Sequence, residues 1–248
     1  MTTRREVFQL LMAGAAPQGV VREKPARKPS VVFLSGETEY DSERSLTRIA
    51  QELESRHGMR CQVLAASSKA DLPGLEMLED ADLAVFFVDF LALPAGQLSQ
   101  IRAYLNGGKP LVALRTTIRG FDNWKEFGQD VLGASWRYDH DSTSSTDVTV
   151  IAEAAGHPIL EGVAKECHCR SWLYHVLPLS SSAKPLLMGR SVGESQRPER
   201  EPNPVAWTKT YKGSRVFYTS LGHPEDFQME PFHRLLINAV YWALDRQR

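Results

Sequence analysis

The polar run Arg115-Thr116-Thr117 carries the first side chains of this sequence whose types and position could do chemistry, because it directly follows the apolar run 111–114. A guanidinium can clamp an anionic or polyhydroxylated ligand with paired hydrogen bonds. Threonine hydroxyls and backbone amides at the start of a helix can hold an anion or oxyanion. Simple capping of the following helix is an equally good interpretation of the two threonines.

Two histidines are the other candidates for proton transfer or ligand binding. His223 follows the expected strand 216–220 through Leu221-Gly222, and Asp226 comes three residues later. We expect His223 to act as a general acid or base, or to bind a sugar hydroxyl. The alternative is a histidine that bonds only to its own loop.

His140 stands beside Asp141 in a polar loop, and imidazole and carboxylate are common metal ligands. These two residues are weak metal candidates, because adjacent residues rarely bind one ion and a solvated loop explains the pattern as well. His140 is also a candidate for contact with substrate.

Acidic and aromatic residues near the expected strand ends complete the candidate site. Glu37, Glu39 and Tyr40 lie in the loop after the first apolar run, and Asp89 follows the run 83–88. A salt bridge from Arg115 to Asp89 or Glu37 is a structural alternative to ligand binding. Sugar rings stack on aromatic faces, so the tryptophans and tyrosines near strand ends suit a carbohydrate pocket, although core packing is their default role. These aromatic candidates are Trp207, Trp172, Tyr174 and Tyr40.

The elements that position these side chains follow from hydrophobic patterning. Short apolar runs at 30–35, 61–65, 83–88 and 111–114 predict buried strands. Helical spacing predicts helices from Ser42 to Gly58 and from Pro94 to Gly107. Strands alternating with helices indicate βαβ units and a parallel sheet, with ligands at the carboxyl ends of the strands. The composition of 121–132 predicts one more helix.

The pattern changes in the second half of the chain. Strands are predicted at 146–151, 167–177 and 184–189, followed by a hairpin of 205–210 with 215–219 and a last helix at 231–244. No repeat or second domain is visible, so 29–248 is expected to form a single domain. The outer strands after Thr146 offer edges that favour self-association into a homo-oligomer.

Composition excludes several classes of partner. The 248 residues carry a net charge of −1 without a basic block, so we expect no nucleic-acid partner. No apolar run reaches the roughly 20 residues that span a bilayer. The three cysteines do not make a disulfide framework. Cys167 and Cys169 would point to one face of a strand, and ordinary packing is the simpler interpretation.

The first 28 residues read as a leader and linker. Thr3-Arg4-Arg5-Glu6-Val7-Phe8 resembles a twin-arginine export motif before a short apolar segment. The segment is short and interrupted by Gln9, so an amphipathic leader helix is the alternative. We expect a cytoplasmic protein, with export to the periplasm as the alternative.

Three segments carry a family resemblance, in the expected order between Val31 and the carboxyl terminus. The segment 203–223, from Asn203-Pro-Val-Ala-Trp to Ser-Leu-Gly-His223, resembles the carboxyl-terminal signature of ThuA-like (trehalose-utilisation) proteins. Gly156-His-Pro-Ile-Leu-Glu-Gly162 and Leu235-Leu-Ile-Asn-Ala-Val-Tyr-Trp242 resemble the same family. The resemblance implies an α/β flavodoxin-like three-layer sandwich with a mostly parallel central sheet and extra C-terminal strands.

That fold is similar to class I glutamine amidotransferases, in which the strand corresponding to 111–114 ends at a nucleophilic cysteine. Here the position holds Arg115, whose guanidinium cannot replace a thiolate nucleophile. The resemblance to the fold therefore does not imply glutaminase activity.

The resemblance implies a protein of carbohydrate utilisation that binds or transforms a sugar or oxidised sugar. For an enzyme, we expect His223 to carry the proton and Arg115 to act as the electrostatic clamp, without a cofactor. Glu37, Glu39 or Asp89 would be the partner carboxylate. The alternatives are a non-catalytic sugar-binding or scaffold protein and a metal-dependent hydrolase.

Overall fold

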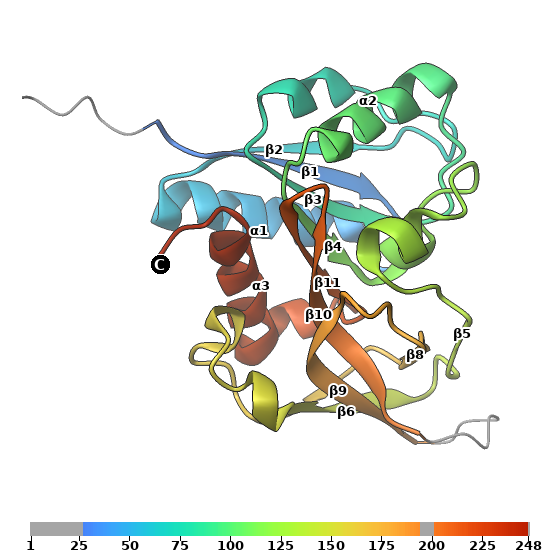
Figure 1. Ribbon diagram of the computed structural model, residues 1–248, viewed down its shortest axis with the longest axis vertical. Helices are drawn as coiled ribbons and strands as arrows, with labels where there is room; N and C mark the ends of the chain where they lie inside the picture. The colour runs from blue at the N-terminus through green and yellow to red at the C-terminus, as the bar shows by residue number, and fades with distance from the viewer. Residues whose placement is uncertain (1–26, 194–200, 248) are drawn as a thin grey trace, which may run out of the picture.

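A nine-stranded sheet in the order β2-β1-β3-β4-β11-β10-β9-β6-β7 forms the centre of the protein (Figure 1). The computed structural model describes residues 27–193 and 201–247. The expected export motif therefore lies outside the described residues.

One half of the sheet is parallel, as the apolar runs predict. β1 pairs with β2 and β3, and β4 lies between β3 and β11. The strands of this half are fully or largely buried, except for the edge strand β2. Their bounds are Ser30–Gly36 (β1), Arg60–Ala65 (β2), Leu83–Val88 (β3), Leu111–Leu114 (β4) and Ser214–Thr219 (β11).

The other half of the sheet is antiparallel and supplies the extra strands. β10 and β11 form the predicted hairpin, and both Lys212 and Gly213 in its two-residue turn have positive φ. Such turns match the twist of a hairpin. The strands are Asn203–Tyr211 (β10), Lys184–Val192 (β9), Ser145–Val150 (β6) and Glu166–Cys169 (β7), and a separate two-stranded sheet joins Tyr138–Asp139 (β5) to Tyr174–His175 (β8).

Helices cover both faces of the sheet, which gives three layers (Figure 1). Helices α1 (Ser42–His57) and α3 (Glu230–Ala243) lie side by side, joined by a 3.0 Å hydrogen bond between His57 Nδ1 and the Tyr241 hydroxyl. Helix α2 (Ala95–Asn106) covers the opposite face. The three-layer α/β class expected from the sequence is therefore confirmed. None of the helices in the described ranges is long and apolar enough to cross a membrane.

The helix predicted at 121–132 is wrong. The chain forms a 3₁₀ turn at Arg115–Arg119 (η2) and only a short π-helical turn at Gly128–Leu132 (η3). Phe121, Trp124 and Phe127 instead pack on each other, with ring centroids 4.9 to 6.1 Å apart. Gly128 lies so close to Ile118 that a Cβ would stand 2.4 Å from its carbonyl oxygen. Tertiary packing has thus overridden local helical composition.

The strand predicted at 167–177 is interrupted, because it divides into β7 and β8 with an irregular segment at 170–173 between them. That segment crosses the carboxyl edge of the parallel strands and becomes part of the site. The remaining elements are short 3₁₀ turns at Leu75–Asp80 (η1), Ala152–Ala154 (η4), Pro158–Leu160 (η5) and Asp226–Gln228 (η6).

Candidate functional site

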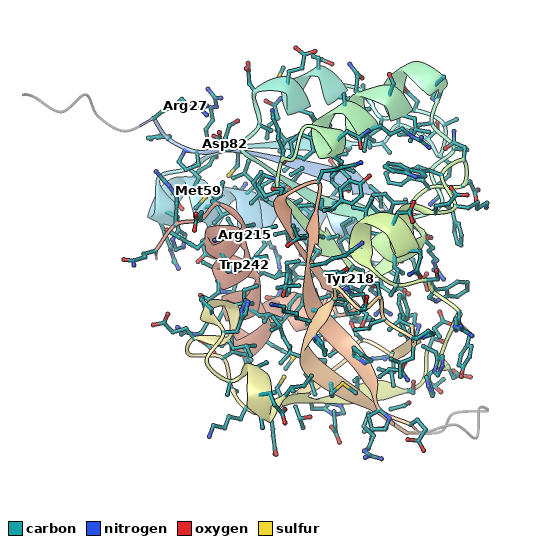
Figure 2. All side chains as sticks on the ribbon, viewed as in Figure 1. Arg27, Met59, Asp82, Arg215, Tyr218 and Trp242 are labelled. Atoms are coloured by element: carbon teal, nitrogen blue, oxygen red, sulfur yellow. The ribbon has the colours of Figure 1, made fainter. Side chains whose placement is uncertain are left out.

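Arg115 occupies a sharp elbow at the carboxyl end of β4. Its φ is 43°, a left-handed value that is unfavourable for a side chain with a Cβ. Tyr218 of β11, labelled in Figure 2, donates a 2.7 Å hydrogen bond to the Arg115 carbonyl oxygen and holds the turn. The residue is fully buried. A strained, enclosed arginine thus stands where β4 ends.

Three aromatic rings surround the guanidinium of Arg115. Its central carbon lies 4.2 Å from the ring centroid of Tyr40, 4.5 Å from that of Trp172 and 4.8 Å from that of Tyr174. We call these three side chains the aromatic cage. Each contact has the geometry of a cation–π interaction. The cage is built from the β1–α1 loop (Tyr40), the segment between β7 and β8 (Trp172) and the first residue of β8 (Tyr174), so distant parts of the chain meet at the elbow.

The guanidinium has few polar partners inside this cage. One terminal nitrogen donates a 2.9 Å hydrogen bond to the Ser220 carbonyl oxygen. In the described part of the chain, the Nε and second terminal nitrogen of Arg115 make no well-aligned hydrogen bond, although the Tyr40 hydroxyl and, more weakly, Asp226 interact with the guanidinium. No Asp or Glu of the described residues lies within ion-pair distance of it. A buried charge without a carboxylate is costly to maintain. The structure therefore does not support the interpretation of Arg115 as a structural salt bridge.

Arg119 forms the salt bridge with Asp89 that the sequence suggested for Arg115. Its Nε lies 2.9 Å from Asp89 Oδ1, and its guanidinium stacks on Trp136 at 4.6 Å. The next polar residues of the elbow are also bound internally. The Thr117 hydroxyl donates to the Phe86 carbonyl and accepts from the Val88 amide, which fastens the elbow to β3.

Thr116 is fully buried, and its hydroxyl lacks a hydrogen-bond partner in the described structure. Of the two threonines expected to bind substrate, Thr117 thus has a structural role, whereas the substrate contact expected for Thr116 stays a prediction.

His223 packs against the outer members of the aromatic cage. Its ring centroid lies 6.3 Å from that of Tyr40 and 6.2 Å from that of Trp172, and the side chain is 19% exposed. Its Nδ1 accepts a long hydrogen bond, 3.3 Å, from the Glu225 amide. Burial lowers the pKa of His223 below its ordinary value, although Asp226 opposes the shift. A neutral, partly exposed imidazole thus stands beside the rings that enclose Arg115.

Gly222 permits the turn that places His223, because its φ of 138° is unfavourable for any other residue. Asp226 then organises the loop. One of its oxygens accepts from the Arg170 amide at 2.7 Å, and the other accepts from the Ser171 hydroxyl and from the amides of Gly222 and His223. The carboxylate of Asp226 is therefore occupied by the protein and positions the histidine.

Glu37 lies at the carboxyl end of β1, where it lines an open cleft of about 410 Å³ together with Lys69 and the Ser67 and Ser68 loop. Its two oxygens accept hydrogen bonds from the amides of Glu39 and Tyr40. Burial raises the pKa of Glu37 to about 7, although those two amide bonds act in the opposite direction. A carboxyl that titrates near neutrality is suited to acid or base work.

The remaining predicted site residues differ in burial and in their bonds within the protein. Glu39 is exposed. Trp207 is fully buried in the core, where its indole N–H is donated to the Leu132 carbonyl at 2.6 Å. His140 is buried after β5, and its amide donates to the Leu173 carbonyl, next to the aromatic cage. Asp141 accepts the Thr143 amide. No group of three His, Cys, Asp or Glu residues in the described ranges could hold a metal ion.

Sequence reasoning named Trp172 and Tyr174 as aromatic candidates without selecting them over Trp207. Both lie within the strand predicted at 167–177, and their aromatic character near putative strand ends was their only signal. Ser171 and Ser220, which orient Asp226 and Arg115, had no signal in the sequence, because their contacts bridge more than fifty residues.

The fold and the site define a flavodoxin-like α/β protein whose first polar residue after β4 is a caged arginine. The chain belongs to the ThuA family, described as trehalose utilisation, whose model matches residues 30–243. No curated protein matches the chain.

Solved structures share the fold at low sequence identity. A ThuA-like protein of Bacteroides uniformis ATCC 8492 is 16% identical, with 90% of this chain and 94% of that one covered and a TM-score of 0.67. A ThuA-like protein of Parabacteroides merdae ATCC 43184 is 15% identical, with 90% and 93% covered and a TM-score of 0.70. A cytoplasmic protein of Salmonella typhimurium is 13% identical, with 86% and 98% covered and a TM-score of 0.58.

Proposed function

We propose that this protein binds a sugar or an oxidised sugar at the carboxyl edge of its parallel strands and transforms it by proton transfer through His223. The observation that carries the proposal is the guanidinium of Arg115, which is buried without a carboxylate and has two nitrogens free of well-aligned hydrogen bonds. A ligand that brings negative charge would supply the missing partner. The family's trehalose-utilisation description supports a carbohydrate as the substrate class.

The aromatic cage suits a sugar ring and also controls access. Tyr40 and Trp172 have ring centroids 5.3 Å apart and separate Arg115 from solvent. A ligand reaches the guanidinium only when one of these rings moves, and then stacks its C–H face on the other. Binding would thus include a conformational step that exchanges cation–π contacts for a pairing with ligand oxygens.

Two groups can move protons at this site. His223 is neutral at pH 7 because burial lowers its pKa, so it can accept a proton from a carbon or hydroxyl of the substrate. Glu37 has a pKa of about 7 and can hold or release one proton near that pH. Tyr40 connects them, since its amide binds Glu37 and its ring contacts His223. Arg115 would stabilise negative charge that develops on the substrate.

A substrate screen tests the proposal. Disaccharides, keto-sugars and sugar acids are incubated with the full chain, and binding and product are followed by thermal shift and mass spectrometry. We expect His223→Gln to lower kcat by about 10²- to 10⁴-fold. The matched control is His168→Gln, because His168 is an exposed histidine on β7 that pairs with Asp147. Equal loss in both variants, or no loss in His223→Gln, would remove His223 from the mechanism. Saturable binding without product would favour the non-catalytic alternative.

We also propose a cytoplasmic location, which is supported by the structural similarity to the cytoplasmic protein of Salmonella typhimurium. Fractionation of cells that express the full chain tests it, and recovery in the periplasm would contradict it.

A further inference from the structure

Cys167 and Cys169 lie on one face of β7, and their sulfur atoms are 3.9 Å apart. Cys169 is buried, whereas Cys167 is partly exposed and lines an open cavity of about 790 Å³ between β6, β7 and β9. β7 is the last strand of the sheet and pairs only with β6. An accessible thiol thus stands beside a buried thiol on a strand that is free to bend on one side.

We propose that Cys167 and Cys169 form a peroxide-sensitive dithiol, in which Cys167 reacts first and Cys169 resolves it to a reversible disulfide. This modification depends only on the chain's own thiols and does not rest on the proposed function.

The contact between the two sulfurs assigns their roles. A hydrogen bond from Cys169 lowers the pKa of Cys167, and the same contact together with burial raises the pKa of Cys169. An accessible cysteine whose pKa is lowered, beside a resolving cysteine, is the arrangement of thiols that sense oxidants. The third cysteine, Cys61 on β2, has no thiol neighbour in the described residues, and burial raises its pKa to about 12.

The chemistry balances with a hydroperoxide as the oxidant. The Cys167 thiolate attacks one peroxide oxygen, the O–O bond breaks, and hydroxide or alkoxide leaves with a sulfenic acid formed on Cys167. The Cys169 sulfur then attacks the Cys167 sulfur, and the S–O bond breaks as the S–S bond forms. The departing hydroxide takes the Cys169 thiol proton and leaves as water. The two thiols together lose two electrons, and the peroxide is reduced.

Backbone geometry makes the bridge labile. Residues two apart on a strand have Cα atoms about 6.7 Å apart, at the upper limit of the 4.4–6.8 Å that disulfides span. Closure therefore bends β7, and a bridge under such strain is easily reduced.

A bend in β7 would alter the hydrogen bonds of the candidate site. The two residues after Cys169 are Arg170 and Ser171, which bind Asp226, and Asp226 holds the amide of His223. Oxidation should thus change the hydrogen bonds that position His223 while leaving the rest of the sheet in place.

Peptide mapping of the full chain tests the proposal. Trypsin releases both thiols in one peptide, Glu166–Arg170, and Cys61 in another. After hydrogen peroxide and alkylation, we expect the first peptide to lose two hydrogens, resist alkylation and recover with reductant. Cys167 should be oxidised at least about tenfold faster than Cys61. Hydrogen exchange should increase at 170–172 and 222–226 in the oxidised protein.

Single substitutions separate the roles. Cys169→Ser should stop the reaction at a sulfenic acid that dimedone traps on Cys167. Cys167→Ser should abolish oxidation of the peptide, and Cys61→Ser should leave it unchanged. Oxidation of Cys61 at the same rate as Cys167, or bridges that link only separate molecules, would overturn the proposal. Because Cys169 is buried, Cys169→Ala provides the same test if the serine variant folds poorly.

Discussion

Replacement of Arg115 by methionine tests whether the caged guanidinium is kept for a ligand or for stability. The change removes one charged hydrogen bond, to the Ser220 carbonyl, which contributes about 1.5–3 kcal/mol. It also removes three ring contacts of about 0.5–2 kcal/mol each. These losses are opposed by a gain. A buried guanidinium without a carboxylate costs several kcal/mol of desolvation, and methionine removes that cost. Methionine also adds apolar burial of about 1.5–3 kcal/mol.

These terms nearly cancel, so we expect the free energy of unfolding to change by no more than about 2 kcal/mol. For a protein of this length, that is a shift in Tm of no more than about 8 °C. Urea unfolding at pH 7 measures the change. In the same variant, ligand-induced stabilisation should be lost, because the group proposed to pair with the ligand is absent.

Arg119→Met is the matched control. Arg119 is also stacked on aromatic rings, but its removal leaves the largely buried Asp89 carboxylate unpaired. We expect a loss of about 3 kcal/mol, clearly larger than for Arg115→Met. If Arg115→Met instead costs more than about 4 kcal/mol, or more than the control, the guanidinium is a structural stabiliser and the reasoning from its missing partner fails.

Three further changes test the groups around the elbow. Asp226→Asn should lower the free energy of unfolding, measured in urea, by about 2–4 kcal/mol. The carboxylate accepts several amide and hydroxyl hydrogen bonds, and the amide has only one acceptor oxygen. An unchanged urea midpoint would contradict the role of Asp226 as loop organiser. Gly222→Ala should lower the free energy of unfolding by about 1–3 kcal/mol because of the φ of 138°. The cost comes from the backbone alone, because the nearest neighbour of the added Cβ, Arg115 Cβ, would lie at 3.6 Å without a clash. The pKa of Glu37 is raised from 4.5 to about 7. Its contribution to the stability of the fold is therefore fully present below pH 4.5 and is lost as the pH rises through 7. Glu37→Gln should therefore stabilise the protein relative to the wild type more at pH 8 than at pH 4.5, and a pH-independent difference would refute the raised pKa.

Hydrophobic runs predicted the parallel half of the sheet, because a strand that is buried on both faces consists of consecutive apolar residues. β3 and β4 lie where the runs 83–88 and 111–114 predicted them, and each ends at a polar residue. The carboxyl ends of adjacent parallel strands must share one edge. The placement of Arg115, Asp89 and Glu37 at that edge therefore followed from the expectation of a parallel sheet.

The partners within that group could not be predicted. Arg115 and Arg119 both lie in η2, and the sequence does not indicate which of them reaches Asp89. Arg115 lies instead among the rings of the aromatic cage, at an elbow where its φ is 43°. The cage itself depends on the irregular segment 170–173, which patterning assigned to a strand. Local periodicity carries no information about a segment whose conformation is decided by long-range contacts.

Three unfavourable features meet at Arg115, and their coincidence is more informative than each alone. A left-handed φ, a buried cation and two nitrogens without well-aligned hydrogen bonds each reduce stability. The surroundings keep them in place through the Tyr218 hydrogen bond to the elbow carbonyl and the compact turn at Gly222. A methionine or leucine at the same position would remove two of the three costs without altering the backbone. A buried cation that one substitution would remove, yet that the surrounding rings and hydrogen bonds hold in place, fits the proposed ligand site better than a purely structural role.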